Sequence, residues 1–295
     1  MFLTYNIFGS NPPKNDVNSL IKLIIDLGYE VTLMKIITFL SDFGLKDGHV
    51  AQMKGVTYGI SDARLVDITH EITPHNVLEG AFILRSAVPY FPVGSVHVAV
   101  VDPGVGTDRK GIVVATKKHV LIGPDNGLLM PAAHFFGGFV VYEITNKKYL
   151  SRSVSNTFHG RDVFAHVAAH IVNGVSFEEV GARINDFVDL DFGCGERKDN
   201  VVVGKVIYID RFGNVITNIP MDLVLEGVGY DTKIEILIGK NSVEVFFVRS
   251  YGFVKKGEIL ATIGSSNFFE IGINQGDAAK KLSVKEGDAV EIVFD

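Results

Sequence analysis

The sequence has a single cysteine, Cys194, and no tryptophan among its 295 residues. One cysteine excludes an internal disulfide framework and any cysteine-based zinc finger. The chain also has no surplus of positive charge, because 28 lysine and arginine residues stand against 34 aspartate and glutamate residues, for a formal net charge of −6. Since a sequence-independent nucleic-acid binder needs a cationic face for phosphate, we expect no nucleic-acid partner.

Long hydrophobic runs are also missing. Although 47% of the residues are hydrophobic, no stretch approaches the ~20 uncharged apolar residues that a membrane span requires. Residues 1–33 show no basic region before their apolar run and no small-residue cleavage site after it, so they do not resemble a signal peptide. We expect a soluble, cytoplasmic protein with no membrane partner. Either Met34 is its natural start, or residues 21–27 form an additional helix.

The chain after Met34 alternates short β-rich runs with helical ones. Helices are expected at residues 49–60, 76–90 and 162–173. The second of them has a start signal in Thr73, which can cap the helix, followed by Pro74. Strands are expected at residues 36–40, 65–68, 96–101, 112–115 and 139–144. This alternation predicts an α/β domain with a largely parallel central sheet over residues 34–190.

The pattern changes in the last third of the chain. Residues 191–200 are polar and glycine-rich, which is typical of a linker. The strands expected beyond it are 201–209, 233–238, 243–248, 258–262 and 289–294. Short alternating strands with almost no helix predict a second, smaller all-β domain over residues 201–295, either a barrel or a sandwich.

Two carboxylates directly follow expected strands. Asp42 comes after the strand 36–40 and Asp102 after the strand 96–101, and each is followed by a glycine within two residues. Ligands of open α/β sheets bind beyond the carboxyl ends of the strands, and glycine lets a ligand approach the backbone closely. Both are therefore candidate ligand-binding residues, although Ser-Asp-Phe-Gly and Asp-Pro-Gly are also common turn sequences.

His159 lies just before the expected helix 162–173. Because a helix N-terminus disfavours an imidazolium, His159 is either a neutral proton acceptor or a residue that caps the helix. His166 and His170 have the spacing of metal ligands, but no third ligand is evident nearby, so we interpret them as packing residues. The sequence thus predicts no metal site.

A polar stretch in the second domain, residues 210–218, holds Asp210, Asn214 and Asn218 around a glycine between two apolar strands. Amide groups there are able to read the donors and acceptors of a purine edge. The alternative is a polar hairpin turn. A second polar cluster follows the strand 258–262 and consists of Ser265, Ser266, Asn267 and Glu270.

Five motifs run in one order along the chain from Met34 to the C-terminus. They are Ser41-Asp42-Phe43-Gly44, Val101-Asp102-Pro103-Gly104-Val105-Gly106-Thr107 with Arg109, Pro124-Asp125-Asn126-Gly127, Thr157-Phe158-His159-Gly160-Arg161-Asp162 and Phe212-Gly213-Asn214-Val215. Together they closely resemble the S-adenosyl-L-methionine hydrolases, also called SAM hydroxide adenosyltransferases, which are relatives of the bacterial fluorinase and chlorinase. Both expected domains take part in the resemblance, and residues 1–33 lie outside it.

The resemblance implies that S-adenosyl-L-methionine and water give adenosine and L-methionine by displacement at ribose C5′, with no cofactor. It also implies a seven-stranded central sheet, a C-terminal β-barrel and a homotrimer. In the family, each site lies between one subunit's N-terminal domain and its neighbour's C-terminal domain. The water-activating triad of the family falls on Asp102, Arg109 and His159.

The same resemblance implies the substrate-binding residues. Asp42 would hold the ribose hydroxyls, Asp47 the methionine ammonium, and Asn214 the adenine or the ribose. The other implied binding residues are Asp210, Tyr251, Ser265, Ser266, Glu270 and Ile273. The halogenases have neutral residues where Asp102 and His159 stand, which favours water over halide as the nucleophile. The alternative functions are a non-catalytic SAM sensor, a SAM-dependent halogenase and a metal-dependent phosphoesterase.

Overall fold

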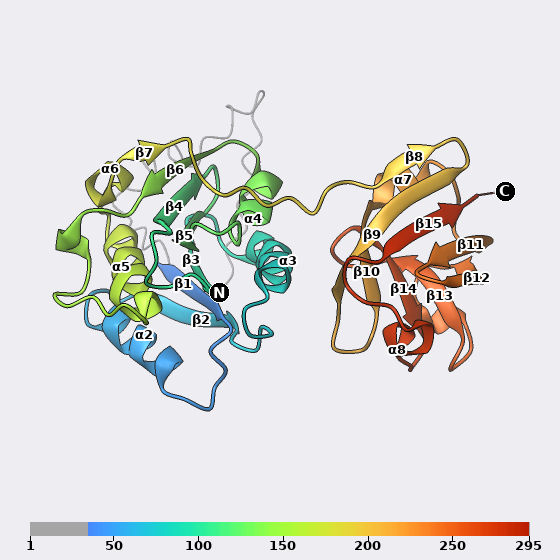
Figure 1. The fold of residues 1–295 in the computed structure, drawn as a ribbon, viewed down its shortest axis with the longest axis horizontal. Helices are drawn as coiled ribbons and strands as arrows, with labels where there is room; N and C mark the ends of the chain where they lie inside the picture. The colour runs from blue at the N-terminus through green and yellow to red at the C-terminus, as the bar shows by residue number, and fades with distance from the viewer. Residues whose placement is uncertain (1–34, 295) are drawn as a thin grey trace, which may run out of the picture. The chain divides into compact units, whose positions relative to one another are not determined.

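The computed structural model describes residues 35–294. Residues 1–33 and the expected start at Met34 lie outside the described residues. Consecutive stretches of the described chain form two sheets, one of seven strands and one of eight (Figure 1). Between residues 35 and 294, no helix is both long enough and apolar enough to cross a membrane.

The seven-stranded sheet has a parallel part and an antiparallel part. Its spatial order is β2 (Arg64–Thr69), β1 (Ile36–Ser41), β3 (Val96–Val100), β5 (Val120–Pro124), β4 (Gly111–Thr116), β6 (Phe139–Glu143) and β7 (Arg183–Ile184). Neighbours from β2 to β5 run parallel, whereas the pairs β5–β4, β4–β6 and β6–β7 are antiparallel. Strand β6 has the same direction as the four parallel strands β2, β1, β3 and β5. The predicted α/β domain with a largely parallel sheet is therefore confirmed. The antiparallel edge is an addition to that prediction.

Helices cover both faces of this sheet (Figure 1). Phe39 of β1 packs in one apolar cluster with Met53 of α2 (His49–Tyr58) and Val167 of α5 (His166–Val172). Leu40, the next residue of β1, packs in the other cluster with Leu84 of α3 (Val77–Ala87), and α4 (Met130–Phe136) lies on that face as well. Successive strand residues point to opposite faces, so a strand covered on both sides is apolar at nearly every position. The shorter helical pieces of this part are η1 (Val88–Tyr90), η2 (Lys147–Tyr149) and α6 (Phe177–Val180).

Helix α3 begins within one residue of its predicted start at position 76, but its capping residue differs from the prediction. The expected cap is Thr73, but the capping side chain is that of Asn76, whose Oδ1 accepts the backbone N–H of Glu79 at 3.1 Å. His75 has a φ of 70°, outside the helical region, and its N–H donates to the carboxylate of Asp42 at 2.9 Å. The helix therefore starts only after this contact, and the prediction of Thr73 as the cap is wrong.

The third expected helix begins with wide turns. Its first part, η3 (Gly160–Ala165), is π-helical and continues directly into α5. A π-helical turn is rare and occurs frequently at functional sites. The helix therefore starts two residues before the predicted position 162, and His159 immediately precedes its first turn.

The eight-stranded sheet closes into a barrel. Its spatial order is β10 (Val215–Pro220), β14 (Phe268–Ile273), β13 (Ile259–Ile263), β12 (Asn241–Phe247), β11 (Thr232–Ile238), β15 (Ala289–Val293), β9 (Val201–Ile209) and β8 (Glu196–Lys198). A further pairing of β9 with β10, in which Ile209 lies opposite Val215, joins the ends and closes a ring of seven strands. The predicted β-barrel is thus confirmed. Strand β8 lies within the segment interpreted as a linker, and α7 (Met221–Leu225) and α8 (Ala278–Leu282) are short.

Two buried histidines join neighbouring strands of the first sheet. His97 of β3 bonds through Nδ1 to Oγ1 of Thr38 at 2.8 Å and through Nε2 to Nδ1 of His119 at 3.3 Å. Burial, together with the charge of His119, lowers the pKa of His97 to about 3, and burial also lowers the pKa of His119. This connection between β1, β3 and the start of β5 therefore requires uncharged imidazoles.

We expect mild acid to destabilise the protein through His97. The unfolded chain takes up a proton on this imidazole below its ordinary pKa of about 6.5, whereas the folded protein does not until pH 3, so stability falls as the pH falls between these values. The free energy of unfolding should drop by about 2 kcal/mol from pH 7 to pH 5 on account of this group alone. Urea unfolding at both pH values, on the wild type and His97→Gln, measures the difference. An equal drop in the two proteins would contradict the assignment.

Candidate active site

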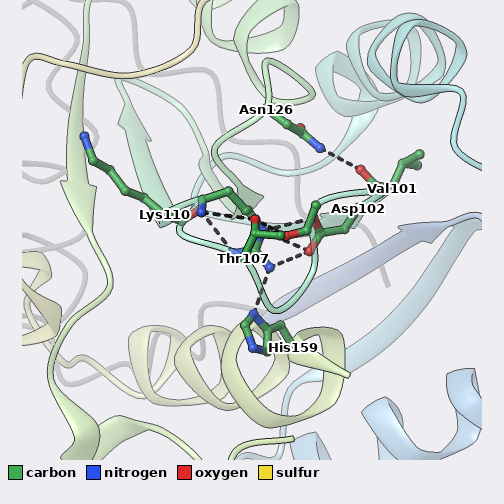
Figure 2. Close-up of polar contacts among 8 residues, drawn as sticks. Val101, Asp102, Thr107, Lys110, Asn126 and His159 are labelled. Carbon is green, nitrogen blue, oxygen red and sulfur yellow. Dashed lines mark hydrogen bonds and ion pairs between the residues drawn. The ribbon is translucent and has the colours of Figure 1, made fainter. Parts of the chain in front are cut away.

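The three residues predicted as a triad contact one another, and Figure 2 shows Asp102 and His159 on either side of this contact. Nε of Arg109 donates to both oxygens of the Asp102 carboxylate, at 2.9 and 3.0 Å, and Nη2 makes a further short contact with Oδ2. Nη2 also lies 2.9 Å from Nδ1 of His159. The side chains of Asp102 and Arg109 are only 5% and 11% exposed. One guanidinium therefore joins a buried carboxylate to an imidazole.

The environment of His159 keeps its ring neutral. Burial, and next the positive charge of Arg109, lower the pKa of His159, and the carboxylates of Asp102 and Asp162 only partly oppose them. The position at a helix N-terminus correctly predicted a neutral His159, but burial is the largest cause of its lowered pKa. Because a guanidinium has only donors, Nδ1 of His159 must be the acceptor, so the proton of the neutral ring is on Nε2.

Two loops hold this arrangement in place. Nδ2 of Asn126 donates to the carbonyl oxygen of Val101 at 2.8 Å, which fixes the backbone just before Asp102 (Figure 2). Gly106 has a φ of 77°, and a Cβ on it would lie 2.3 Å from the carbonyl oxygen of Asn156. No side chain fits in that space. The glycine therefore lets the loop after β3 approach the loop that carries His159.

Asp42 shares a cavity of about 230 Å³ with two members of the triad, Asp102 and His159. The other lining residues are Phe43, Pro74, His75, Val100, Val105, Thr157, Phe158 and Gly160. Oδ2 of Asp42 accepts the N–H of His75, and within residues 35–294 its Oδ1 has no hydrogen-bond partner. Asp47 does not line this cavity and lies exposed in the turn before α2.

A buried serine and histidine behind Asp42 were not predicted. Oγ of Ser41 lies 2.7 Å from Nδ1 of His70, and Nε2 of His70 lies 3.1 Å from the Asp67 carboxylate. The backbone N–H of Phe43 donates to the Ser41 oxygen at 3.3 Å. His70 follows the expected strand 65–68, so the strand-end argument that singled out Asp42 would also have found it.

The barrel has a second cavity, of about 600 Å³. It is lined by Phe212, Asn214, Tyr251, Ile273, Asn274, Gln275, Gly276 and Asp277. Three of the predicted binding residues therefore meet there, namely Asn214, Tyr251 and Ile273. The two cavities share no lining residue, so the chain distributes the predicted residues over two separate places.

The remaining predicted residues of the barrel lie around this second cavity or away from it. Asp210 bonds to Asn214, with Nδ2 of the amide 2.8 Å from Oδ2 of the carboxylate. Glu270 accepts a short hydrogen bond from the hydroxyl of Tyr251. Burial raises the pKa of Glu270, and it raises the pKa of Tyr251 as well. The two serines point elsewhere: Ser266 Oγ lies 3.3 Å from Oγ of Ser86, and Ser265 is exposed.

Family models match both parts of the chain. The SAM hydroxide adenosyltransferase N-terminal domain matches residues 37–181, and the C-terminal domain of the same family matches residues 204–291. The chain belongs to the SAM hydroxide adenosyltransferase family. The resemblance drawn from the five motifs is thereby confirmed.

Individual relatives agree with this assignment. A protein of Methanocaldococcus jannaschii named (R)-S-adenosyl-L-methionine hydrolase is 41% identical and covers 89% of this chain and 97% of its own length. A fluorinase of Nocardia brasiliensis is 31% identical and covers 87% of this chain and 96% of its own. The crystal structure of an uncharacterized conserved protein from Thermotoga maritima superposes with a TM-score of 0.84, at 41% identity, covering 87% of this chain and 99% of that one.

In the described part of this family member, no group of three or more histidine, cysteine, aspartate or glutamate side chains is placed to hold a metal ion. His170 instead packs its ring against Tyr149, with the ring centroids 5.1 Å apart.

Replacing Arg109 should raise the pKa of His159. In Arg109→Gln the nearby positive charge is gone, and the Asp102 carboxylate, no longer paired, favours the imidazolium more strongly. An NMR titration of the histidine Cε1 protons measures this pKa in the wild type and the variant. Arg152→Gln, which removes an exposed arginine from the segment before His159, is the control. A pKa of His159 that stays the same or falls in Arg109→Gln would contradict the described contact.

Proposed function

We propose that this protein hydrolyses (R)-S-adenosyl-L-methionine to adenosine and L-methionine. The observation that carries the proposal is the contact of Arg109 with both Asp102 and His159 beside a cavity that Asp42 also lines. The hydrolase name of the relative from Methanocaldococcus jannaschii supports the choice of substrate.

The reaction requires a nucleophile rather than an acid. Water forms a new C5′–O bond and gives up one proton, while the C–S bond breaks and its electron pair stays on sulfur, so that L-methionine leaves as a neutral thioether. Because the leaving group needs no proton, the difficulty lies in water itself, whose pKa in bulk is about 15.7. The site must therefore align one water with the C–S bond and accept its proton.

We assign these tasks to the three residues of the triad. Asp102, whose carboxylate is paired with Arg109, orients the water by accepting a hydrogen bond from it. Neutral His159 accepts the proton on Nδ1, the ring nitrogen that carries the lone pair. In this structure Nδ1 accepts from Nη2 of Arg109, so this contact must open before the proton of the water can reach Nδ1. The carboxylates of Asp102 and Asp162 stabilise the imidazolium that forms.

The charges of the first cavity also favour water over a halide. The positive charge of Arg109 is already matched by the Asp102 carboxylate at hydrogen-bond distance. A halide ion beside this pair would gain little attraction and would meet the repulsion of the carboxylate. Water has no net charge to be repelled and can donate to Asp102. The charges of the first cavity therefore favour hydrolysis over halogenation, although fluorinases are among the relatives.

Substrate binding is assigned to both cavities. In the first one, Oδ1 of Asp42 is available for a ribose hydroxyl. Asp47, in the exposed turn outside this cavity, would bind the methionine ammonium. In the second one, Asn214 would read the adenine, with Tyr251 and Ile273 as walls. Asp210 and Glu270 contact Asn214 and Tyr251, and Ser265 and Ser266, which do not line the cavity, complete the binding residues that we assign to the barrel.

We further propose that the active protein is a homotrimer, with each site formed by the first cavity of one subunit and the second cavity of its neighbour. Two observations support this arrangement. The ribose-binding and adenine-binding candidates of one chain line cavities with no residue in common. Phe212, a lining residue of the second cavity, is a large apolar side chain that is 75% exposed in the single chain.

Substitution of the triad should stop turnover without abolishing binding. Asp102→Asn removes the charged acceptor and His159→Ala removes the base, so each should lower turnover at least about 10²-fold, while the affinity for the substrate stays largely intact. Incubation of the wild type with S-adenosyl-L-methionine in ¹⁸O-water, followed by mass analysis, should give adenosine that carries the label. Turnover and substrate affinity of both variants are measured under the same conditions.

Three results would contradict the hydrolase proposal. Near-wild-type turnover in either variant would refute the assigned roles. Adenosine without ¹⁸O would exclude attack by water at C5′. Loss of activity on treatment with EDTA would indicate a metal-dependent enzyme instead.

Two inactive variants should restore activity when they assemble together. Asp102→Asn damages only the first cavity and Asn214→Ala only the second, so a mixed trimer contains interfaces in which both halves are intact. With random assembly, about a quarter of the sites should be of this kind. Light scattering gives the oligomeric state, and the activity of the co-expressed variants is compared with that of each variant alone. A monomer, or a mixture no more active than its components, would contradict the shared site.

A further inference from the structure

The carboxylate of Asp42 lies between two loops, the one after β1 and the one after β2. His75, in the second loop, donates its backbone N–H to Oδ2 of Asp42 at 2.9 Å. The φ of His75 is 70°, a left-handed conformation that residues other than glycine adopt infrequently. Such an outlier persists only where the surrounding contacts determine it. The position of Asp42 therefore depends on what holds the second loop in place.

His70 joins the two loops on both sides of Asp42. Its carbonyl oxygen accepts the backbone N–H of Gly44 at 2.7 Å, and its Nδ1 lies 2.7 Å from Oγ of Ser41. The same serine oxygen accepts the backbone N–H of Phe43 at 3.3 Å. The residues that contact His70 thus stand immediately before Asp42 and two positions after it.

The ring of His70 is fixed from its far side as well. Nε2 lies 3.1 Å from Oδ1 of Asp67, and Oδ2 of this carboxylate accepts a hydrogen bond from Nζ of Lys54 at 2.6 Å. The side chain of His70 is only 2% exposed. Turning the ring would move both nitrogens away from these polar groups, in a place with no access to water, and unpaired buried polar atoms are costly. His70 therefore offers Ser41 a partner in one defined position.

A β-bulge in β2 brings Asp67 and His70 to the same side of the chain. Phe39 of β1 pairs with Asp67. The next residue, Leu40, pairs with Thr69, so β2 has one extra residue at this point. In a regular strand, residues three positions apart point to opposite faces, and the extra residue reverses this alternation. Bulges beside active sites commonly redirect a side chain in this way.

We propose that His70 is a positioning residue that, through Ser41, holds the Asp42 carboxylate where it binds the ribose hydroxyls of the substrate. Oδ2 of Asp42 is occupied by the N–H of His75, so Oδ1 is the oxygen left for the ribose. Hydrogen bonds weaken when their geometry is distorted, so a shift of this turn would lower the affinity for the hydroxyls. His70 does not line the first cavity and has to act through the turn. This inference rests on the proposed function and deepens it.

The test compares, by calorimetry, the binding of adenosine with that of 2′,3′-dideoxyadenosine, which lacks both ribose hydroxyls. The ratio of the two affinities measures the contribution of the hydroxyls alone. In His70→Gln the amide reaches the place of Nε2 and leaves no polar atom at the place of Nδ1, so the contact with Ser41 is lost. In the conservative variant His70→Asn the amide takes the place of Nδ1 and can keep this contact. Asp42→Ala gives the ratio that remains without the carboxylate.

The wild type should bind adenosine at least about 10-fold more tightly than dideoxyadenosine, because hydrogen bonds to a charged group are among the stronger ones. In His70→Gln this ratio should fall at least about 5-fold toward that of Asp42→Ala, while the affinity for dideoxyadenosine changes less than about 2-fold. His70→Asn should keep the ratio within about 2-fold of the wild type. An unchanged ratio in His70→Gln, or an equal fall in both variants of His70, would overturn the inference. A merely structural role would weaken both nucleosides together and leave their ratio unchanged.

Ser41→Ala keeps the test decisive if His70→Gln does not fold. It removes the oxygen that contacts both His70 and the N–H of Phe43, so the ratio should fall as in His70→Gln. Because residues in one hydrogen-bond network are not additive, the double variant should lose no more than either single variant. An unchanged ratio in Ser41→Ala, or losses that add up in the double variant, would overturn the inference.

The same measurements separate this inference from the proposed function. If the wild type hydrolyses S-adenosyl-L-methionine but binds both nucleosides equally, the ribose role of Asp42 and this inference fail, and the hydrolase proposal stands. If the wild type neither hydrolyses that substrate nor binds either nucleoside, the proposed function fails as well.

Discussion

The first cavity depends on the position of a single guanidinium group. Arg109 holds Asp102 with Nε and Nη2 and reaches His159 with Nη2, and its guanidinium lies over the ring of Phe164, 5.2 Å from the centroid. Removing ions from water is costly, and a buried pair is tolerated only if the remaining hydrogen bonds are made. A lysine has one compact charge and cannot bind a carboxylate in a fork while reaching a second acceptor. The geometry of the loop after β3 therefore follows from an arginine at this position.

The second cavity uses a charge in a similar way. Asp210 binds two backbone N–H groups of its turn and the amide of Asn214, so the charged group orients an uncharged neighbour. In the first cavity Arg109 likewise determines which nitrogen of neutral His159 carries the proton. In both cavities, hydrogen bonds fix the position of a charged side chain. That side chain in turn fixes the orientation or the tautomer of an uncharged neighbour. Such preorganisation reduces the free energy that binding or catalysis would otherwise spend on reorientation.

The sequence predicted those features that depend on local pattern. The apolar strands that end before Asp42 and Asp102, the alternation of strands and helices, and the later run of short strands all indicate the two observed sheets. Features that depend on distant contacts were not predictable. Asn76 rather than Thr73 caps α3, because the Asp42 carboxylate holds the N–H of His75 from a strand more than thirty residues earlier in the sequence. The expected domains already placed Asp42 and Asn214 apart, but which other residues line each cavity is a property of the closed fold and leaves no local signal.

The side chains of Ser41, His70 and Asp67 contact one another in series, and their geometry shows that they are not a catalytic site. The three residue types are those of a serine hydrolase, and the contacts of 2.7 and 3.1 Å are of the right length. Ser41, however, is 0% exposed and its oxygen already accepts the N–H of Phe43, so no substrate carbonyl can reach it. The backbone N–H of Gly44 also donates to the carbonyl oxygen of His70, at 2.7 Å. Ser41 and His70 thus stabilise the turn after β1 through hydrogen bonds to its backbone. The carboxylate of this turn that lines the cavity is that of Asp42.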